Sequence, residues 1–153
     1  MNKFEQLGLS ESLQRAIIDL GFENPTEVQE KAIPLLLEKD TDLVALAQTG
    51  TGKTAAFGFP VIQKIDANNR NTQALILSPT RELCLQITNE LKNYSKYEKG
   101  INVVAVYGGA SITEQARDIK RGAQIIVATP GRMQDMINRG LVNISQINYC
   151  ILD

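Results

Sequence analysis

The sequence predicts an α/β protein with a doubly wound, mainly parallel sheet that carries helices on both faces. From residue 42 onward, short apolar runs alternate with longer amphipathic segments, as strands alternate with helices. The apolar runs have no polar face, which is typical of strands covered on both sides. The chain has 153 residues, of which 43% are hydrophobic and 22% charged, so we expect one globular structural domain of ordinary composition.

Residues 1–40 are predicted to form a helical region that precedes the sheet. Ser10 is a good N-cap for a first helix, which Gly21 would end. One apolar face of this helix would carry Leu13, Ile17, Ile18 and Leu20. Thr26 can cap a second helix, and Pro34 inside that helix predicts a kink or a break.

Residues 41–153 are predicted to form the α/β core, which is incomplete at its C-terminal end. The expected strands are residues 43–47, 74–77, 103–106, 125–128 and 149–152. The expected helices are residues 55–65, 81–97, 113–120 and a segment that runs from the end of the fourth strand to about residue 138.

A glycine-rich loop at residues 47–54 joins the first expected strand to the following helix. Its glycines let backbone N–H groups crowd around phosphate oxygens, and the helix N-terminus adds positive potential. Lys53 would reach the β- and γ-phosphates, and the hydroxyl of Thr54 would ligate Mg²⁺. The loop residues assigned to the phosphates are Thr49, Gly50, Thr51 and Gly52. The alternative is an ordinary glycine turn, and Ala47 stands where the usual phosphate-loop pattern begins with glycine.

Three further groups of unusual residues follow expected strands, at the edge where sheets of this class bind ligands. They comprise Pro79, Thr80 and Arg81, then Gly108 and Gly109, and then Thr129, Gly131 and Arg132. Hydroxyl, guanidinium and helix N-terminal N–H groups together suit a phosphodiester backbone. Helix capping with a solvated arginine is the alternative for each group alone, and their recurrence at one edge favours nucleic-acid binding.

Taken together, these motifs resemble the first RecA-like domain of a DEAD-box RNA helicase. Residues 21–29 resemble the adenine-recognition motif of that family, and Ala47 is the residue with which this class begins its phosphate loop. Residues 79–83, 108–109 and 129–132 match the motifs Ia, GG and Ib. The resemblance runs from residue 4 to the end of the chain.

The resemblance implies an ATP- and Mg²⁺-dependent RNA helicase that binds RNA through its sugar-phosphate backbone. Gln29 would pair with adenine through its amide, and Phe4 would stack on the ring. Phe22 and Thr26 belong to the same predicted adenine site. The alternatives are a core position for Phe4 and a solvent-facing position for Gln29.

Residues 149–153 resemble the strand that enters the Asp-Glu-Ala-Asp box of the family, cut after its first aspartate. Asp153 would hold Mg²⁺, with water between the ion and the carboxylate. The groups that orient water, and a second RecA-like domain with an arginine finger, would lie beyond this residue. Lys53 and Asp153 are therefore the catalytic candidates, and we expect this fragment alone to be nearly inactive as an ATPase.

Composition restricts the other classes of function. The net charge is −1, so any nucleic-acid site must be a local patch, and the absence of histidine excludes imidazole catalysis. Cys84 and Cys150 suit a reduced cytoplasm, and we expect no leader and no membrane span. An ATP-dependent RNA clamp remains an alternative, and so does an unrelated kinase or GTPase, which comparable binding of ATP and GTP would favour.

Overall fold

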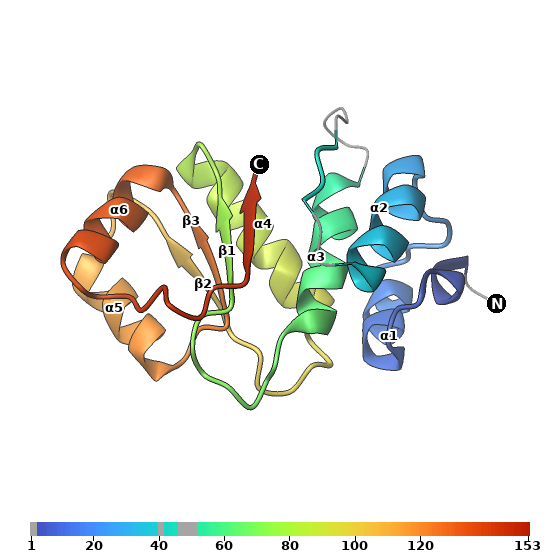
Figure 1. The fold of residues 1–153 in the computed structure, drawn as a ribbon, viewed down its shortest axis with the longest axis horizontal. Coiled ribbons are helices and arrows are strands. Elements are labelled where there is room, and N and C mark those ends of the chain that lie inside the picture. Colours follow the sequence, from blue (N-terminus) through green and yellow to red (C-terminus); the bar gives the residue numbers. More distant parts are fainter. Residues whose placement is uncertain (1–2, 40–41, 46–51) are drawn as a thin grey trace. The chain divides into compact units, whose positions relative to one another are not determined.

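The computed structural model describes residues 3–39, 42–45 and 52–153, which fold as two compact units (Figure 1). The first unit comprises Met1–Lys64 and Asn93–Glu98, and the second comprises Ile65–Lys92 and Lys99–Asp153. The first unit therefore extends beyond the helical region expected at residues 1–40. The predicted division at residue 40, as a boundary between functional regions, stays a prediction.

The first unit is helical in its described part. Its elements are η1 (Lys3–Leu7), α1 (Glu11–Asp19), α2 (Glu27–Glu38) and α3 (Lys53–Lys64). The largest of its fully buried side chains are Phe4, Leu13, Ile17, Ile33, Phe59 and Ile62. The rings of Phe59 and Tyr94 lie with their centroids 4.6 Å apart, so the end of α4 (Arg81–Tyr94) joins this core.

The segment that follows α4 is tied to α1 by polar contacts. The Lys96 ammonium lies 2.7 Å from the Asp19 carboxylate, and the Arg15 guanidinium lies 4.5 Å from the centre of the Tyr97 ring. The hydrogen bond from Lys96 holds the pKa of Asp19 below its ordinary value. Glu98 accepts a hydrogen bond from the Ser12 hydroxyl. These contacts explain why a segment distant in sequence belongs to the first unit.

The N-caps predicted for α1 and α2 are confirmed. The Ser10 hydroxyl accepts from the Leu13 amide, and Thr26 forms a reciprocal capping box with Gln29. The expected apolar face of α1 was wrong at Ile18, whose side chain is 60% exposed, and at Leu20, which follows the last residue of the helix and is 36% exposed. The face that is buried carries Leu13, Ala16 and Ile17. Ile18 lies a further 100° around the helix from Ile17, which turns it away from the core.

Of the kink or break expected at Pro34, the break was wrong, because α2 runs without interruption from Glu27 to Glu38, and the kink stays a prediction. A proline removes one helical hydrogen bond, the one that its missing N–H would donate. Ala32 and Ile33 are buried beside it, and α2 packs extensively against α3. This burial offsets the lost bond and keeps the second half of α2 helical.

The strand expected at residues 43–47 was wrong in its described part. Residues 42–45 have no strand conformation, and the Val44 side chain is 87% exposed. Residues 46 and 47 lie outside the described residues. Apolar composition favours a strand only where neighbouring strands supply the ladder of hydrogen bonds, and residues 42–45 form no such ladder within the described part of the chain.

The second unit contains a parallel sheet with the order β2-β3-β1-β4. The strands are β1 (Ala74–Leu77), β2 (Val103–Val106), β3 (Ile125–Ala128) and β4 (Tyr149–Leu152), each with the bounds expected from sequence. Ala74 pairs with Ile125 and with Tyr149, and Val103 pairs with Ile125. All four strands therefore begin at one level and end at one level, which places their carboxyl ends along a single edge.

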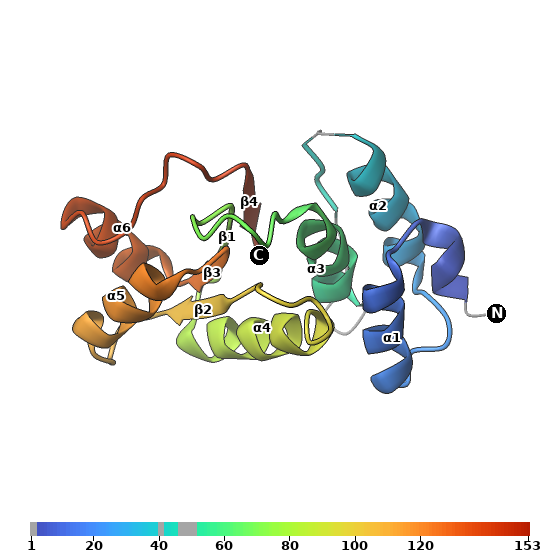
Figure 2. The same cartoon turned by 90° about the horizontal axis from the view of Figure 1, so that it is seen from below.

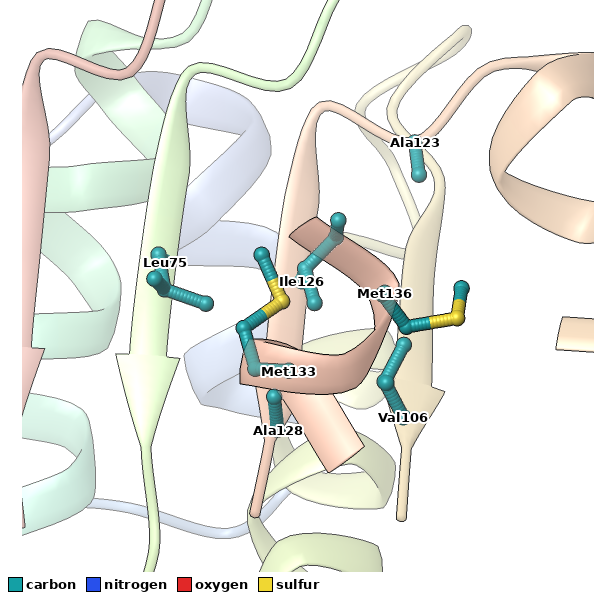
Figure 3. Packing of buried hydrophobic residues seen from close by; sticks show 7 residues of the cluster. All are labelled: Leu75, Val106, Ala123, Ile126, Ala128, Met133 and Met136. Atoms are coloured by element: carbon teal, nitrogen blue, oxygen red, sulfur yellow. The ribbon is translucent and has the colours of Figure 1, made fainter. Parts of the chain in front are cut away.

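Helices cover both faces of this sheet, as predicted. Met133 and Met136 of α6 (Pro130–Asn138) pack on Leu75 and Ile126 (Figure 3). On the same face, α5 (Ile112–Arg121) adds Ile112, Ala116 and Ile119. The other face is covered by α4 (Figure 2). The Cys84 thiol of this helix donates to the Val127 carbonyl at 3.2 Å. Burial raises the pKa of this thiol.

Candidate functional site

In the first unit, Gln29 joins the start of α2 to the residue just before α3. Its Oε1 accepts from the Thr26 amide at 3.0 Å, and its Nε2 donates to the Gly52 carbonyl at 3.2 Å. Its side chain is buried, which is contrary to the solvent-facing alternative. The capping box therefore holds Gln29 against the end of the predicted phosphate loop.

Gly52 adopts a conformation that favours glycine, with φ at +81°. A Cβ atom built on this residue would lie 2.2 Å from the Nε2 atom of Gln29 and 3.2 Å from the Thr26 hydroxyl. Two separate constraints, the backbone angle and the close approach of Gln29, therefore require glycine at this position.

The helix α3 begins at Lys53, two residues earlier than the sequence suggested. Lys53 and Thr54 occupy its first turn, and both are half-buried. The first described helical bond runs from the Ala56 amide to the Gly52 carbonyl, so amides of the first turn remain available for an anion. The expected loop residues Thr49, Gly50 and Thr51 lie outside the described residues.

The Phe4 ring is buried in the core of the first unit and is 1% exposed. Its centroid lies 6.4 Å from that of Phe22, in a stacked arrangement, and 6.4 Å from that of Phe59. This is the core position that the sequence left as an alternative. Neither face of Phe4 is open to an adenine in this conformation, whereas the neighbouring Phe22 is only half-buried.

In the second unit, the three predicted groups lie together at the carboxyl edge of the sheet. The Ser78 amide donates to the Ala128 carbonyl, and the Thr129 amide donates to the Val106 carbonyl. Each bond joins the exit of one strand to the end of its neighbour. The residues brought to this edge are Pro79, Thr80, Arg81, Gly108, Gly109, Thr129, Gly131 and Arg132.

Asp153 follows β4 at the same edge. Its amide donates to the Leu77 carbonyl at 3.0 Å and extends the ladder between β4 and β1. Its carboxylate is exposed. The carboxylate expected to act on Mg²⁺ thus lies on the carboxyl edge that also holds the predicted RNA-binding groups.

Arg81 lies beside the turn at residues 107–110, called the glycine turn below because it contains Gly108 and Gly109. Its guanidinium carbon is 5.0 Å from the centre of the Tyr107 ring, within the range of a cation–π contact. A Cβ atom on Gly109, where φ is +85°, would lie 3.3 Å from the Nη1 atom of Arg81. The exposed guanidinium of Arg81 is therefore placed by the aromatic ring and by the small size of Gly109.

Arg132 is hydrogen-bonded to the same turn. Its Nη1 donates to the Ala110 carbonyl and to the Gln115 amide oxygen, both at 3.0 Å. It is half-buried, so the solvated arginine of the capping alternative does not describe it. Arg81 and Arg132 thus both contact the segment 107–110.

The two threonines differ in their capping contacts. The Thr80 hydroxyl accepts from the Leu83 amide at 3.2 Å and caps α4, although its own proton stays available for donation. Thr129 is the N-cap residue of α6 but its side chain makes no capping bond. Capping therefore accounts for Thr80 and leaves the hydroxyl of Thr129 without that role.

Sequence reasoning missed Tyr107 and Gln115 at this edge. A signal for Gln115 was present, because it shares the apolar face of α5 with Ile112 and Ile119, and a polar residue at a core position indicates a specific partner. Tyr107 had no comparable signal, since an aromatic residue at the end of a strand is usual.

Two kinds of feature are absent from the described residues. No group of three or more acidic, cysteine or histidine side chains in these parts of the chain could hold a metal ion. Within the same residues, no helix combines the length and the apolar character that a bilayer crossing requires.

Comparison with known proteins defines the class to which this fold and these groups belong. The family model for DEAD/DEAH box helicases matches residues 26–153, and the chain belongs to that family. Its fold is a RecA-like α/β domain: a DEAD box protein from Methanococcus jannaschii superposes with a TM-score of 0.93 at 44% identity, covering 98% of this chain and 40% of the other. Family membership excludes the unrelated kinase or GTPase.

Individual relatives carry more specific names. The ATP-dependent RNA helicase CshA of Listeria monocytogenes is 50% identical over the whole chain, which spans 29% of that relative. A solved structure of S. cerevisiae Dbp5 bound to RNA and ADP BeF3 has a TM-score of 0.88 at 32% identity, covering 100% of this chain and 38% of Dbp5. The chain thus spans about three tenths of the length of the curated relatives that it matches.

Proposed function

We propose that this chain is the ATP- and RNA-binding part of an ATP-dependent RNA helicase, which couples ATP binding and hydrolysis to local separation of RNA strands. The observation that carries the proposal is the common register of the four strands, which brings three groups suited to phosphates to one edge. The relatives named as RNA helicases support the same activity. We place it in the cytoplasm, where a buried thiol such as Cys84 stays reduced.

Gln29 can still bind the adenine of ATP, because its amide retains hydrogen-bonding capacity after its two internal bonds. An amide oxygen has two lone pairs and an amide nitrogen two protons, and Gln29 uses one of each on Thr26 and Gly52. The second lone pair and proton suit N6 and N7 of adenine. Guanine presents the acceptor O6 where adenine presents the donor N6, so guanine would place an acceptor against the amide oxygen of Gln29, which is also an acceptor. The proposed site therefore selects ATP over GTP.

For the phosphates, Lys53 would contact the β- and γ-phosphates from the first turn of α3. Thr54 and Asp153 have the hydroxyl and carboxylate oxygens that Mg²⁺ prefers, with Asp153 acting through water. When bound, the ion would neutralise charge on the phosphates. Phe22 and the loop residues 49–51 complete the proposed nucleotide set, because Phe22 is the more accessible of the two rings and the buried Phe4 stacks behind it in the core.

For RNA, Arg81 and Arg132 would pair with successive phosphates, and Thr129 would donate its hydroxyl. Such contacts position a strand without reading its bases. The choice of RNA over DNA is supported by the solved relative that is bound to RNA. Pro79, Gly108, Gly109 and Gly131 would contribute by shape and backbone amides.

A second RecA-like domain is the proposed partner within the parent protein. It would supply the arginine finger and close over the RNA, because phosphoryl transfer depends on charge stabilisation by several placed groups. The share of the relatives that the chain covers leaves room for such a domain. The chain alone is accordingly expected to bind ATP and RNA with little hydrolysis.

The test measures displacement of a labelled strand from a short RNA duplex by the parent protein that carries both domains. Displacement is expected with ATP and Mg²⁺, at a much lower level with GTP, and not with the 153-residue chain alone. An ATP-dependent RNA clamp would instead retain RNA in a filter-binding assay with ATP present and displace no strand, and that outcome would overturn the proposal.

The substitution Arg81→Ala should weaken binding of single-stranded RNA of every sequence to a similar extent. Arg81 is exposed and lies beside the glycine turn, where it would contact one phosphate. Losing that contact should flatten the plot of log affinity against log salt by about 0.7. Fluorescence anisotropy with labelled oligouridylate and oligoadenylate at several salt concentrations measures both quantities.

Arg139→Ala is the matched control, because Arg139 is an exposed arginine of the same unit at the C-terminal end of α6. It pairs with Asp135 and lies at the opposite end of this helix from Arg132. The control should leave the salt slope unchanged. If Arg81→Ala weakened one RNA sequence much more than the other, Arg81 would contact a base and the assignment to phosphate would be wrong.

A further inference from the structure

Gln115 is a buried polar side chain near the N-terminal end of α5. It is 6% exposed and shares its helix face with residues that pack on the sheet. A buried amide costs free energy unless hydrogen bonds replace its contacts with water. Its partners therefore indicate why a polar residue occupies a position otherwise suited to leucine.

The amide of Gln115 connects two parts of the carboxyl edge. Its Nε2 donates to the Tyr107 carbonyl at 3.1 Å, and its Oε1 accepts from Arg132 at 3.0 Å. This orientation is fixed by chemistry, because a carbonyl can only accept and a guanidinium can only donate. No other orientation of the amide satisfies both neighbours.

Arg132 completes a hydrogen-bond network around the glycine turn. The same Nη1 that donates to Gln115 donates to the Ala110 carbonyl at 3.0 Å. Gln115 and Arg132 thus bind the carbonyls at the two ends of the segment 107–110. Both protons of this nitrogen are used, which fixes the plane of the guanidinium.

This network leaves two sets of hydrogen-bond donors available for a ligand. Within the described residues, Nε and Nη2 of Arg132 donate to no acceptor, and together they form one side of the guanidinium fork that binds an oxyanion. The amides of Gly108 and Gly109 likewise donate to no acceptor in this part of the chain. Consecutive free amides in a turn with a left-handed glycine form a concavity that suits an anion.

We propose that Gln115 is a positioning residue for RNA binding: it holds Arg132 and the glycine turn in one fixed arrangement, in which the free guanidinium edge and the free turn amides address the phosphates of one strand. This inference rests on the proposed function of the edge. Gln115 itself contacts no RNA and acts through Arg132 and the turn.

The test is a double-mutant cycle on RNA binding with the full chain, using labelled oligouridylate as the probe. Gln115→Leu keeps the side-chain volume and removes both hydrogen bonds. We expect RNA affinity to fall about fivefold, and the salt slope to flatten toward that of Arg132→Ala. In the Arg132→Ala background, Gln115→Leu should weaken binding less than twofold further, because residues that act as one unit are not additive.

Controls separate positioning from a loss of folding. Gln134→Leu, at an exposed glutamine of α6, should change neither affinity nor slope. Binding of ATP should be the same in all variants, because none of the substituted residues belongs to the proposed nucleotide site. If Gln115→Leu does not fold, Gln115→Met replaces it, and Gln115→Glu adds a second measurement, since its carboxylate can accept from Arg132 but would repel the Tyr107 carbonyl.

The possible outcomes are distinct. An unchanged salt slope in folded Gln115→Leu or Gln115→Met, or full additivity with Arg132→Ala, would overturn the role of Gln115. Wild-type affinity in Gln115→Glu would also overturn it, because the turn would then need no anchor. If Arg81→Ala and Arg132→Ala themselves left RNA binding unchanged, the proposed function of the edge would fail instead.

Discussion

Replacing Gly52 with alanine is expected to abolish detectable ATP binding and to lower the free energy of unfolding by about 2–4 kcal/mol. The left-handed backbone at φ +81° contributes about 1–2 kcal/mol of this loss when a Cβ atom is added. The remainder comes from Gln29, whose Nε2 atom would lie 2.2 Å from the new carbon. Moving this buried amide breaks its bond to the Gly52 carbonyl and disturbs the capping box of α2.

Gly21→Ala is the matched control for the backbone contribution. Gly21 also has a left-handed φ, at +77°, but a Cβ atom there would meet nothing within 4 Å. Urea unfolding of both variants, with ATP binding followed by a fluorescent analogue, separates strain from collision. Equal stability losses in the two variants would show that the approach of Gln29 is unimportant. Combining Gln29→Ala with Gly52→Ala should recover the part of the stability loss that comes from the collision between the new Cβ atom and Gln29. The double variant should not recover the selectivity for ATP.

The sheet of the second unit could be predicted from sequence almost completely. Each of its strands is a run of four apolar residues that is followed within two positions by Gly, Pro, Ser or Asp, so both composition and boundaries indicate the element. The parallel register could be expected from the alternation of strands and helices. That register is sufficient to bring the residues after β1, β2 and β3 to one edge.

The failures have a common physical cause, which is that tertiary contacts override local signals. Pro34 does not break α2, because burial beside it offsets a lost hydrogen bond. Residues 42–45 have strand composition without a ladder. Ile18 has the right chemistry for a core position but lies at the wrong angle around α1.

In the candidate site, the residues themselves could be predicted from sequence, and the contacts that hold them could not. Its members could be identified by residue type and spacing, since lysine, threonine, arginine and glycine carry the chemistry of phosphate binding. What holds them could not be identified, because it depends on contacts between elements. Gln29 binds a carbonyl 23 residues away, and Gln115 binds an arginine 17 residues away. Such pairs leave little trace in the sequence of a single chain.

Lys53→Ala should weaken binding of ATP by about 10- to 100-fold while leaving the free energy of unfolding nearly unchanged. The ammonium group would make charge-assisted bonds to the β- and γ-phosphates, each of which contributes more than a neutral hydrogen bond. Among the described residues, Lys53 has no ion-pair partner, so removing its charge breaks no ion pair within this part of the chain. Isothermal titration with ATP, ADP and AMP measures the effect on binding.

The three nucleotides make this prediction specific to the place of Lys53 at the start of α3. The loss should be largest for ATP, smaller for ADP and smallest for AMP, which lacks both distal phosphates. Lys64→Ala removes the same charge from the last turn of the same helix, and should leave all three affinities unchanged. Equal losses for ATP and AMP, or an equal effect of Lys64→Ala, would mean that Lys53 acts through general charge. An unchanged ATP affinity in Lys53→Ala would remove this residue from the phosphate site altogether, since a first-turn lysine that contacts distal phosphates cannot be truncated without loss.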